Sequence, residues 1–121
     1  MWRIKSETAE SIIHAAKSAW PDEFLCLLGG EKEEKLVDEL VIVPAVFGRT
    51  FSFIRTWLVP FDPRIVGSVH SHPGHSNRPS GGDKNSFPRF GEINLIICQP
   101  YGPDTLKAYD LKGNEIGFKI I

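Results

Sequence analysis

Residues 65–83 read IVGSVHSHPGHSNRPSGGD, in which an apolar run leads into two histidines and a loop. The run up to His70 predicts a buried strand, and Pro73 ends that strand because proline has no N–H for the ladder. Alternate side chains of a strand point to the same face, so we expect His70 and His72 to project together, roughly 6.5 Å apart at Cα. Two imidazoles placed in this way can bind one metal ion.

The loop after Pro73 leads to Ser80-Gly81-Gly82-Asp83, which predicts the start of a helix. Asp83 then lies one turn into that helix and offers a carboxylate oxygen. Two histidines with one carboxylate are a common catalytic zinc set, which leaves the fourth tetrahedral position open for water. Two other interpretations stay open. Ser80 and Asp83 have the spacing of a helix capping box, and His75 offers a third imidazole for an all-histidine set.

A hydrolytic zinc site also needs a group that accepts a proton from water. Glu23 is a candidate because it directly precedes the apolar run at 24–28. A carboxylate at the mouth of a core strand is partly desolvated, which raises its pKa toward a useful range. The alternative is an ordinary loop carboxylate that happens to precede a strand.

The rest of the chain predicts one helix, several strands, a short second helix and further strands. The first helix is expected at 7–19, capped by Ser6 and ended by Pro21, with one apolar stripe facing the core. Strands are expected at 24–28 (closed by a turn at Gly29-Gly30), 36–43, 50–59, 64–71 and 93–98, with a charged turn at 31–35 and a hairpin formed by 106–111 and 115–120. The second helix is expected from Ser80 to about residue 90, shortened or kinked by Pro88. This order predicts a sheet with helices packed against it.

Composition excludes some classes of function. The 121 residues include 14 basic and 15 acidic side chains, for a net charge of −1, which argues against a nucleic-acid binder that neutralises phosphates. The length suits one domain over 1–121. No apolar run approaches the ~20 residues that cross a membrane, and the first residues lack the pattern of a signal peptide, so we expect a cytoplasmic protein. Cys26 and Cys98 are expected to be buried and reduced, with a disulfide between them as the alternative.

The run from His70 to Asp83 resembles the motif of the JAMM (MPN-plus, or JAB1/Mov34) metallo-isopeptidases. That motif is an upstream glutamate, then His-Ser/Thr-His-Pro, six residues and Ser-x-x-Asp, and this chain matches every defined position. The segment at 20–30, which holds Glu23, is similar to the segment that carries the family's glutamate. The resemblance implies an α/β (α+β) fold: a curved, mixed and mostly antiparallel sheet flanked by helices, similar to cytidine deaminases.

The same resemblance implies roles for the site residues. His70, His72 and Asp83 would hold Zn²⁺, Glu23 would act as general base and then general acid, and Ser80 would stabilise the oxyanion. The chain looks like the minimal stand-alone archaeal and bacterial members, because it lacks the insertions of the linkage-specific eukaryotic ones. The implied reaction is isopeptidase or peptidase cleavage after the C-terminal Gly-Gly of a ubiquitin-like or sulfur-carrier protein.

Other functions stay open. One is a non-catalytic scaffold, since many relatives have lost their ligands; another is a zinc hydrolase or deaminase of a small molecule or nucleotide. Zinc deaminases use a Pro-Cys-x-x-Cys segment, which this sequence lacks. Neither cysteine lies in a loop suited to a nucleophile. The strand predicted at 50–59 carries Phe51, Phe53 and Trp57; we expect an extended substrate tail to add to such a sheet edge, although the three aromatics could equally be core residues.

Overall fold

The computed structural model describes residues 1–42, 45–47, 52–54 and 62–121. Its elements are, in chain order, β1 (Trp2–Ile4), α1 (Ser6–Ala19), β2 (Leu25–Glu31), β3 (Leu36–Val41), β4 (Ala45–Phe47), β5 (Ser52–Ile54), β6 (Ile65–His72), α2 (Gly81–Phe90), β7 (Ile93–Cys98), the 3₁₀ turn η2 (Pro103–Thr105), β8 (Leu106–Tyr109), β9 (Glu115–Ile116) and β10 (Phe118–Ile120). Eight strands form one sheet in the order β10-β1-β3-β2-β6-β7-β8-β9, and β4 pairs with β5.

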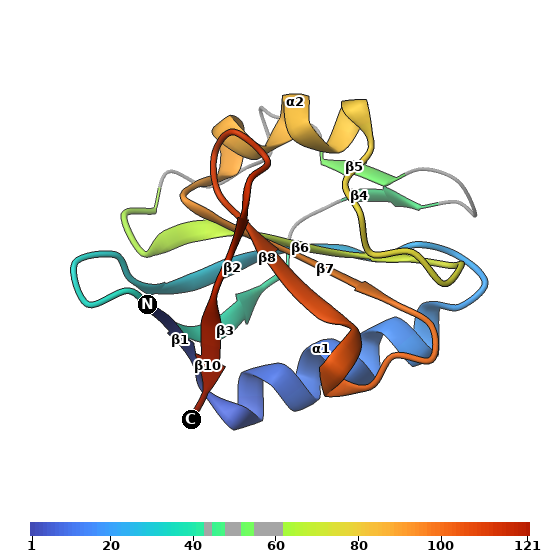
Figure 1. Cartoon of the computed structure of the whole chain (residues 1–121), viewed down its shortest axis with the longest axis horizontal. Coiled ribbons are helices and arrows are strands. Elements are labelled where there is room, and N and C mark those ends of the chain that lie inside the picture. The colour runs from blue at the N-terminus through green and yellow to red at the C-terminus, as the bar shows by residue number, and fades with distance from the viewer. Residues whose placement is uncertain (43–44, 48–51, 55–61) are drawn as a thin grey trace.

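The sheet is mixed and strongly curved. Four of its seven pairings are antiparallel and three are parallel. The two strands at its ends, β9 and β10, follow each other in the chain with only Gly117 between them, so the sheet curls almost to closure (Figure 1). The predicted fold class, a curved and mostly antiparallel sheet flanked by helices, is confirmed.

The two helices cover opposite faces of the sheet, α2 at the top and α1 at the bottom of Figure 1. The inner strand β7 is buried along its whole length because both faces are covered. Its alternate residues go to different sides: Leu95 and Ile97 join the core with Ile12 of α1, whereas Ile96 packs with Phe87 of α2. A side chain on the neighbouring strand β6 therefore faces α2 when its partner in β7 does.

Helix α1 shows the predicted apolar stripe, with Ala9, Ile12 and Ala16 buried, but its predicted cap is wrong. Ser6 is the first helical residue, and Lys5 occupies the N-cap position without a side-chain cap bond. The Ser6 amide instead donates to the carbonyl of Ile121 at 2.8 Å. The carbonyl of Ile121, directly after β10, thus accepts from one of the N–H groups at the helix start that have no partner within the helix.

The predicted turn at Gly29-Gly30 is also wrong, because β2 runs through both glycines to Glu31. Its register against β3 shifts between them, as at a β-bulge. A Cβ on Gly30 would lie 1.8 Å from the carbonyl oxygen of Leu36, so the strand needs glycine for a close backbone approach. The charged turn predicted at 31–35 is observed at 32–35 and makes the connection to β3.

Only the part of the predicted C-terminal hairpin nearest its turn is observed. Strands β8 and β9 pair, but after Gly117 the chain crosses to the other end of the sheet, where β10 pairs in parallel with β1. Strand β1 was not predicted, since three residues give no periodic pattern. Pro88 lies inside α2, which continues to Phe90 without being shortened. The prediction of β7 at 93–98 is confirmed.

Part of the strand predicted at 50–59 lies outside the described residues. Only Ser52–Ile54 is described there, as β5 paired with β4, and Phe51 and Trp57 are not described. The end of the strand predicted at 36–43 also falls outside them. The role predicted for the three aromatics therefore stays a prediction.

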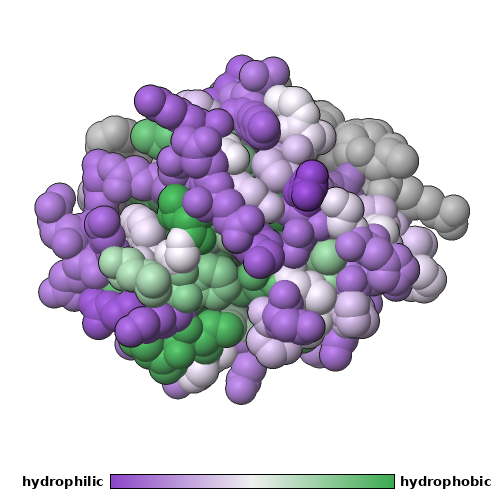
Figure 2. Space-filling model, viewed as in Figure 1, coloured by the Kyte–Doolittle hydropathy of each residue, from purple (hydrophilic) through white to green (hydrophobic). Residues whose placement is uncertain are grey.

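Exposed apolar side chains gather near the two chain ends. Met1, Ile120 and Ile121 are exposed beside the β1–β10 pair, and apolar surface is visible in that region of Figure 2. Both cysteines are free, so the alternative of a disulfide does not hold in this structure. Among the described residues, no helix combines the length and the apolar character needed to span a membrane.

Candidate metal centre

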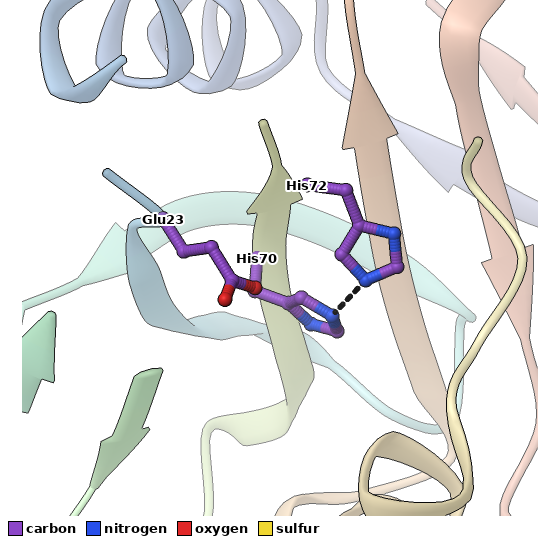
Figure 3. Close-up of side chains that lie close together, drawn as sticks. All are labelled: Glu23, His70 and His72. Atoms are coloured by element: carbon purple, nitrogen blue, oxygen red, sulfur yellow. Dashed lines mark hydrogen bonds between the residues drawn. The ribbon is translucent and has the colours of Figure 1, made fainter. Parts of the chain in front are cut away.

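His70 and His72 project from the end of β6 toward the α2 side of the sheet. His70 pairs in register with Ile96, which packs against α2, and His72 is two residues further along the same strand. Their Nε2 atoms lie 3.1 Å apart (Figure 3). The predicted common direction of the two imidazoles is confirmed. Ser71, between them, faces the other side and is completely buried.

The hydrogen bonds of His72 define its protonation pattern. Its Nδ1 lies 2.9 Å from the carbonyl oxygen of Ser76. A carbonyl can only accept, so Nδ1 must carry the hydrogen, and in the neutral ring Nε2 keeps its lone pair. A metal-binding histidine is normally fixed in this way through its second nitrogen. His72 is therefore oriented to offer Nε2 to a cation.

Asp83 lies against both imidazoles from the first turn of α2. Its Oδ1 is 3.2 Å from Nε2 of His70, and its Oδ2 is 3.2 Å from Nε2 of His72. Oδ2 also accepts a hydrogen bond from the backbone N–H of Ser80 at 2.8 Å, while Ser80 Oγ accepts one from the Asp83 N–H at 3.1 Å. Ser80 and Asp83 therefore form the predicted capping box. The same hydrogen bonds hold the Asp83 carboxylate beside the two imidazoles, so a role in the helix cap does not exclude a role as metal ligand.

Glu23 reaches the same histidines from the segment that precedes β2. Its carboxylate and the ring nitrogens of His70 and His72 lie within 4.8 Å of one another (Figure 3). The segment is tied to β6: the Phe24 N–H donates to Ser71 Oγ at 2.9 Å, and the Ser71 N–H donates to the Phe24 carbonyl at 3.1 Å. Ser71 thus places Glu23, a role that no pattern in the sequence indicated.

The two carboxylates differ in electrostatic environment. Burial raises the pKa of Glu23 above its ordinary value, although the nearby imidazoles act to lower it. Burial would also raise the pKa of Asp83, but hydrogen bonds with His70 and His72 and the Ser80 N–H outweigh it and hold that pKa well below its usual range. Asp83 is therefore the permanent anion of the pair, as a metal ligand must be.

The donor atoms suit zinc. A tetrahedral zinc ion with nitrogen and oxygen ligands at about 2.0–2.1 Å has ligand atoms about 3.3 Å apart. The two Nε2 atoms lie 3.1 Å apart, and each lies 3.2 Å from a different oxygen of Asp83; these separations are close to that value. Three protein ligands leave one position for water or substrate, the pattern of a catalytic site. Partial exposure also suits a site that water or substrate must reach: the side chain of Asp83 is 19% exposed, whereas that of His70 is only 7% exposed.

Other sequence candidates are not part of this cluster. His75 is exposed on the loop after β6, so the third donor beside the two histidines is a carboxylate. Ser80 is exposed and acts as the helix cap; its hydroxyl hydrogen is not used by the cap, because Oγ accepts there. Burial raises the pKa of the Cys26 thiol, which is unfavourable for a nucleophile.

Comparison with known proteins gives consistent matches. The family described as prokaryotic homologs of the JAB domain matches residues 5–112. A protein from Haloferax volcanii named "probable metalloprotease" is 34% identical over 119 residues, which cover 91% of this chain and 73% of that protein. A solved structure described as "JAMM: a metalloprotease-like zinc site in the proteasome and signalosome" is 36% identical, with a TM-score of 0.79 and coverage of 100% of this chain and 98% of that one. A JAB1/MPN domain protein from Archaeoglobus fulgidus is 37% identical, with a TM-score of 0.78 and 98% of each chain covered.

Proposed function

The chain belongs to the JAMM (JAB1/MPN) family of zinc metallohydrolases, and we propose that it cleaves the peptide or isopeptide bond after the C-terminal Gly-Gly of a ubiquitin-like or sulfur-carrier protein. The observation that carries the proposal is the convergence of four side chains from three segments. His70 and His72 come from β6, Asp83 from α2 and Glu23 from the chain before β2. All motif residues are present, which favours an enzyme over a non-catalytic scaffold.

In this proposal, His70, His72 and Asp83 hold the zinc ion and Glu23 moves the proton. Zinc bound there would lower the pKa of water to about 7 and would polarise a carbonyl. Glu23 takes the proton of the attacking water as general base. Burial raises its pKa, which favours the protonated form that then acts as general acid toward the leaving amine. The proton then passes from Glu23 to the nitrogen of the leaving group.

Ser80 is proposed to act on the oxygen of the scissile carbonyl. Its Oγ accepts from the Asp83 N–H at 3.1 Å, which leaves its O–H free to donate. That O–H can stabilise the negative charge that develops on the carbonyl oxygen during attack. The capping box fixes the position of the hydroxyl, so little reorganisation is needed.

The limited exposure of the site supports the proposed substrate class. Glu23 and His70 are almost completely buried, whereas the side chains of His72 and Asp83 are each 19% exposed. A backbone without side chains suits a site of such limited exposure, and Gly-Gly is the slimmest dipeptide. An extended tail can also add to a sheet edge through main-chain hydrogen bonds, and the β4–β5 pair is a candidate edge.

A panel of ubiquitin-like and sulfur-carrier fusions tests this substrate class. We expect the zinc-loaded protein to cleave at least one fusion after Gly-Gly, and a chelator to abolish that cleavage. A bulky residue in place of the penultimate glycine should nearly abolish cleavage, while an equally bulky residue well upstream in the tail serves as the matched control. Equal cleavage of both substrates, or no cleavage of any fusion, would contradict the proposal and favour a small-molecule substrate.

A further inference from the structure

Three successive carbonyl groups are held where β6 ends. The His72 carbonyl accepts a hydrogen bond from the hydroxyl of Tyr101 at 3.1 Å. The Pro73 carbonyl accepts from the indole Nε1 of Trp20 at 3.3 Å and from the side-chain amide of Gln99. The Gly74 carbonyl accepts from the Gln99 backbone N–H at 2.9 Å. Beyond the end of β6, these carbonyls are therefore bonded by donors from the segment that follows β7 and by Trp20, which follows α1.

These donors come from segments distant in sequence that meet at one side of the fold. The parallel strands β6 and β7 end on the same side, and the C-terminal end of α1 lies there too, at the right of Figure 1. Cys98, the last residue of β7, is the register partner of His72. Gln99 and Tyr101 follow directly, so they are the first side chains able to reach the backbone beyond His72.

Tyr101 has an unusual backbone conformation for a bulky residue. Its φ is 64°, in the left-handed region that non-glycine residues rarely adopt. The side chain is only 4% exposed and packs in the main core. Its N–H donates to the Cys98 carbonyl at 2.8 Å, which makes the turn tight. Conformations of this kind persist only where the surroundings impose them, and they cluster at functional sites.

We propose that Tyr101 and Gln99 are positioning residues for the zinc ligand His72. The imidazole of His72 is then fixed from two directions, at Nδ1 by the Ser76 carbonyl and at its backbone by the Tyr101 hydroxyl. Gln99 holds the next peptide, which sets the path of the loop toward Ser76. The inference rests on the ligand role given to His72 in the proposed function. It predicts that zinc affinity depends on a hydroxyl that never touches the metal.

Tyr101→Phe removes that hydroxyl and keeps the ring in the core. We expect the zinc dissociation constant, measured by competition with a chromophoric chelator, to rise about tenfold, as for outer partners of metal ligands. Thr105→Val is the matched control, because it also removes a hydroxyl that donates to a backbone carbonyl, that of Gly102 at 2.8 Å, and neither group belongs to the loop that carries Ser76. Zinc affinity should be unchanged in the control. Thermal unfolding of the metal-free proteins checks that both variants fold.

Gln99→Leu is a second variant, at a partly exposed position, and it tests the same inference if Tyr101→Phe does not fold. It should also weaken zinc binding and change the visible spectrum of the cobalt-substituted protein, because the ligand geometry is altered. Zinc affinities of the folded variants that match the Thr105→Val control would overturn the inference. Failure of the proposed site gives a different result, since His72→Ala would then retain zinc.

Discussion

Glu23 is the residue on which burial and neighbouring charge act in opposite directions. Burial raises its pKa, the imidazoles of His70 and His72 lower it, and the balance leaves it above the ordinary value. We predict that Glu23→Gln keeps the fold and the zinc but loses at least roughly a hundredfold in turnover, the usual size of a general-base effect. Asp22→Asn changes the exposed neighbour in the same way and serves as the control. Near-normal turnover of Glu23→Gln would remove Glu23 from the mechanism.

Ser80 has a structural role that is visible in the hydrogen bonds and a catalytic role that is proposed. As a cap alone, its replacement by alanine costs about 1 kcal/mol of stability and leaves the turnover of the folded protein unchanged. We predict that Ser80→Ala also lowers kcat by roughly 10²-fold or more, with little change in KM, because the donor to the oxyanion is lost. Steady-state kinetics beside a melting curve separates the two roles. A change in the melting temperature alone would reduce Ser80 to a cap.

At the scale of elements, the close approach of β6 to β7 gives the sharpest prediction. A Cβ on Gly67 in β6 would lie 1.5 Å from the carbonyl oxygen of Ile93 in β7. Backbone cannot yield as a flexible side chain does, so Gly67→Ala should lower the free energy of unfolding by about 3 kcal/mol or more, as severe overpacking does. Gly74→Ala is the control, because nothing lies within 4 Å of its added carbon. Urea unfolding curves that coincide for the two variants would show that the strand spacing is wrong.

Sequence patterns predicted the features that depend only on residues close together in the chain. The stripe of α1, the fully apolar β7 and the spacing of His70 and His72 needed no knowledge of distant pairing. Glu23 was different: its approach to His70 depends on the pairing of Leu25 with His70 across β2 and β6, which spacing does not reveal. Its position before the apolar run made Glu23 a candidate, and the family resemblance gave it a role.

What the sequence did not predict depends on contacts between distant segments. Strand β1 is short, and it exists because β3 and β10 pair with it on either side. Gly30 looked like a turn because its real constraint, the carbonyl of Leu36, comes from the neighbouring strand. Tyr101 carried no motif at all, since its partner His72 is 29 residues away.

For the whole molecule, the proposed zinc site joins parts of the fold that the sheet alone does not connect. His70 and His72 belong to the sheet, while Asp83 belongs to α2, which covers one face of it. The metal is therefore expected to fix α2 to the sheet as well as to serve in hydrolysis. The central claim is that this one site binds the zinc of the chain.

The zinc content of the purified protein tests that claim most directly. The chain has four histidines, so two double variants divide them evenly: His70→Ala with His72→Ala removes the proposed ligands, and His14→Ala with His75→Ala removes the two exposed ones. We predict about one zinc per chain in the wild type and in the His14/His75 control, from the three ligands of a catalytic site, and almost none in the His70/His72 variant. Full zinc content in the His70/His72 variant, or loss of zinc in the control, would contradict the account.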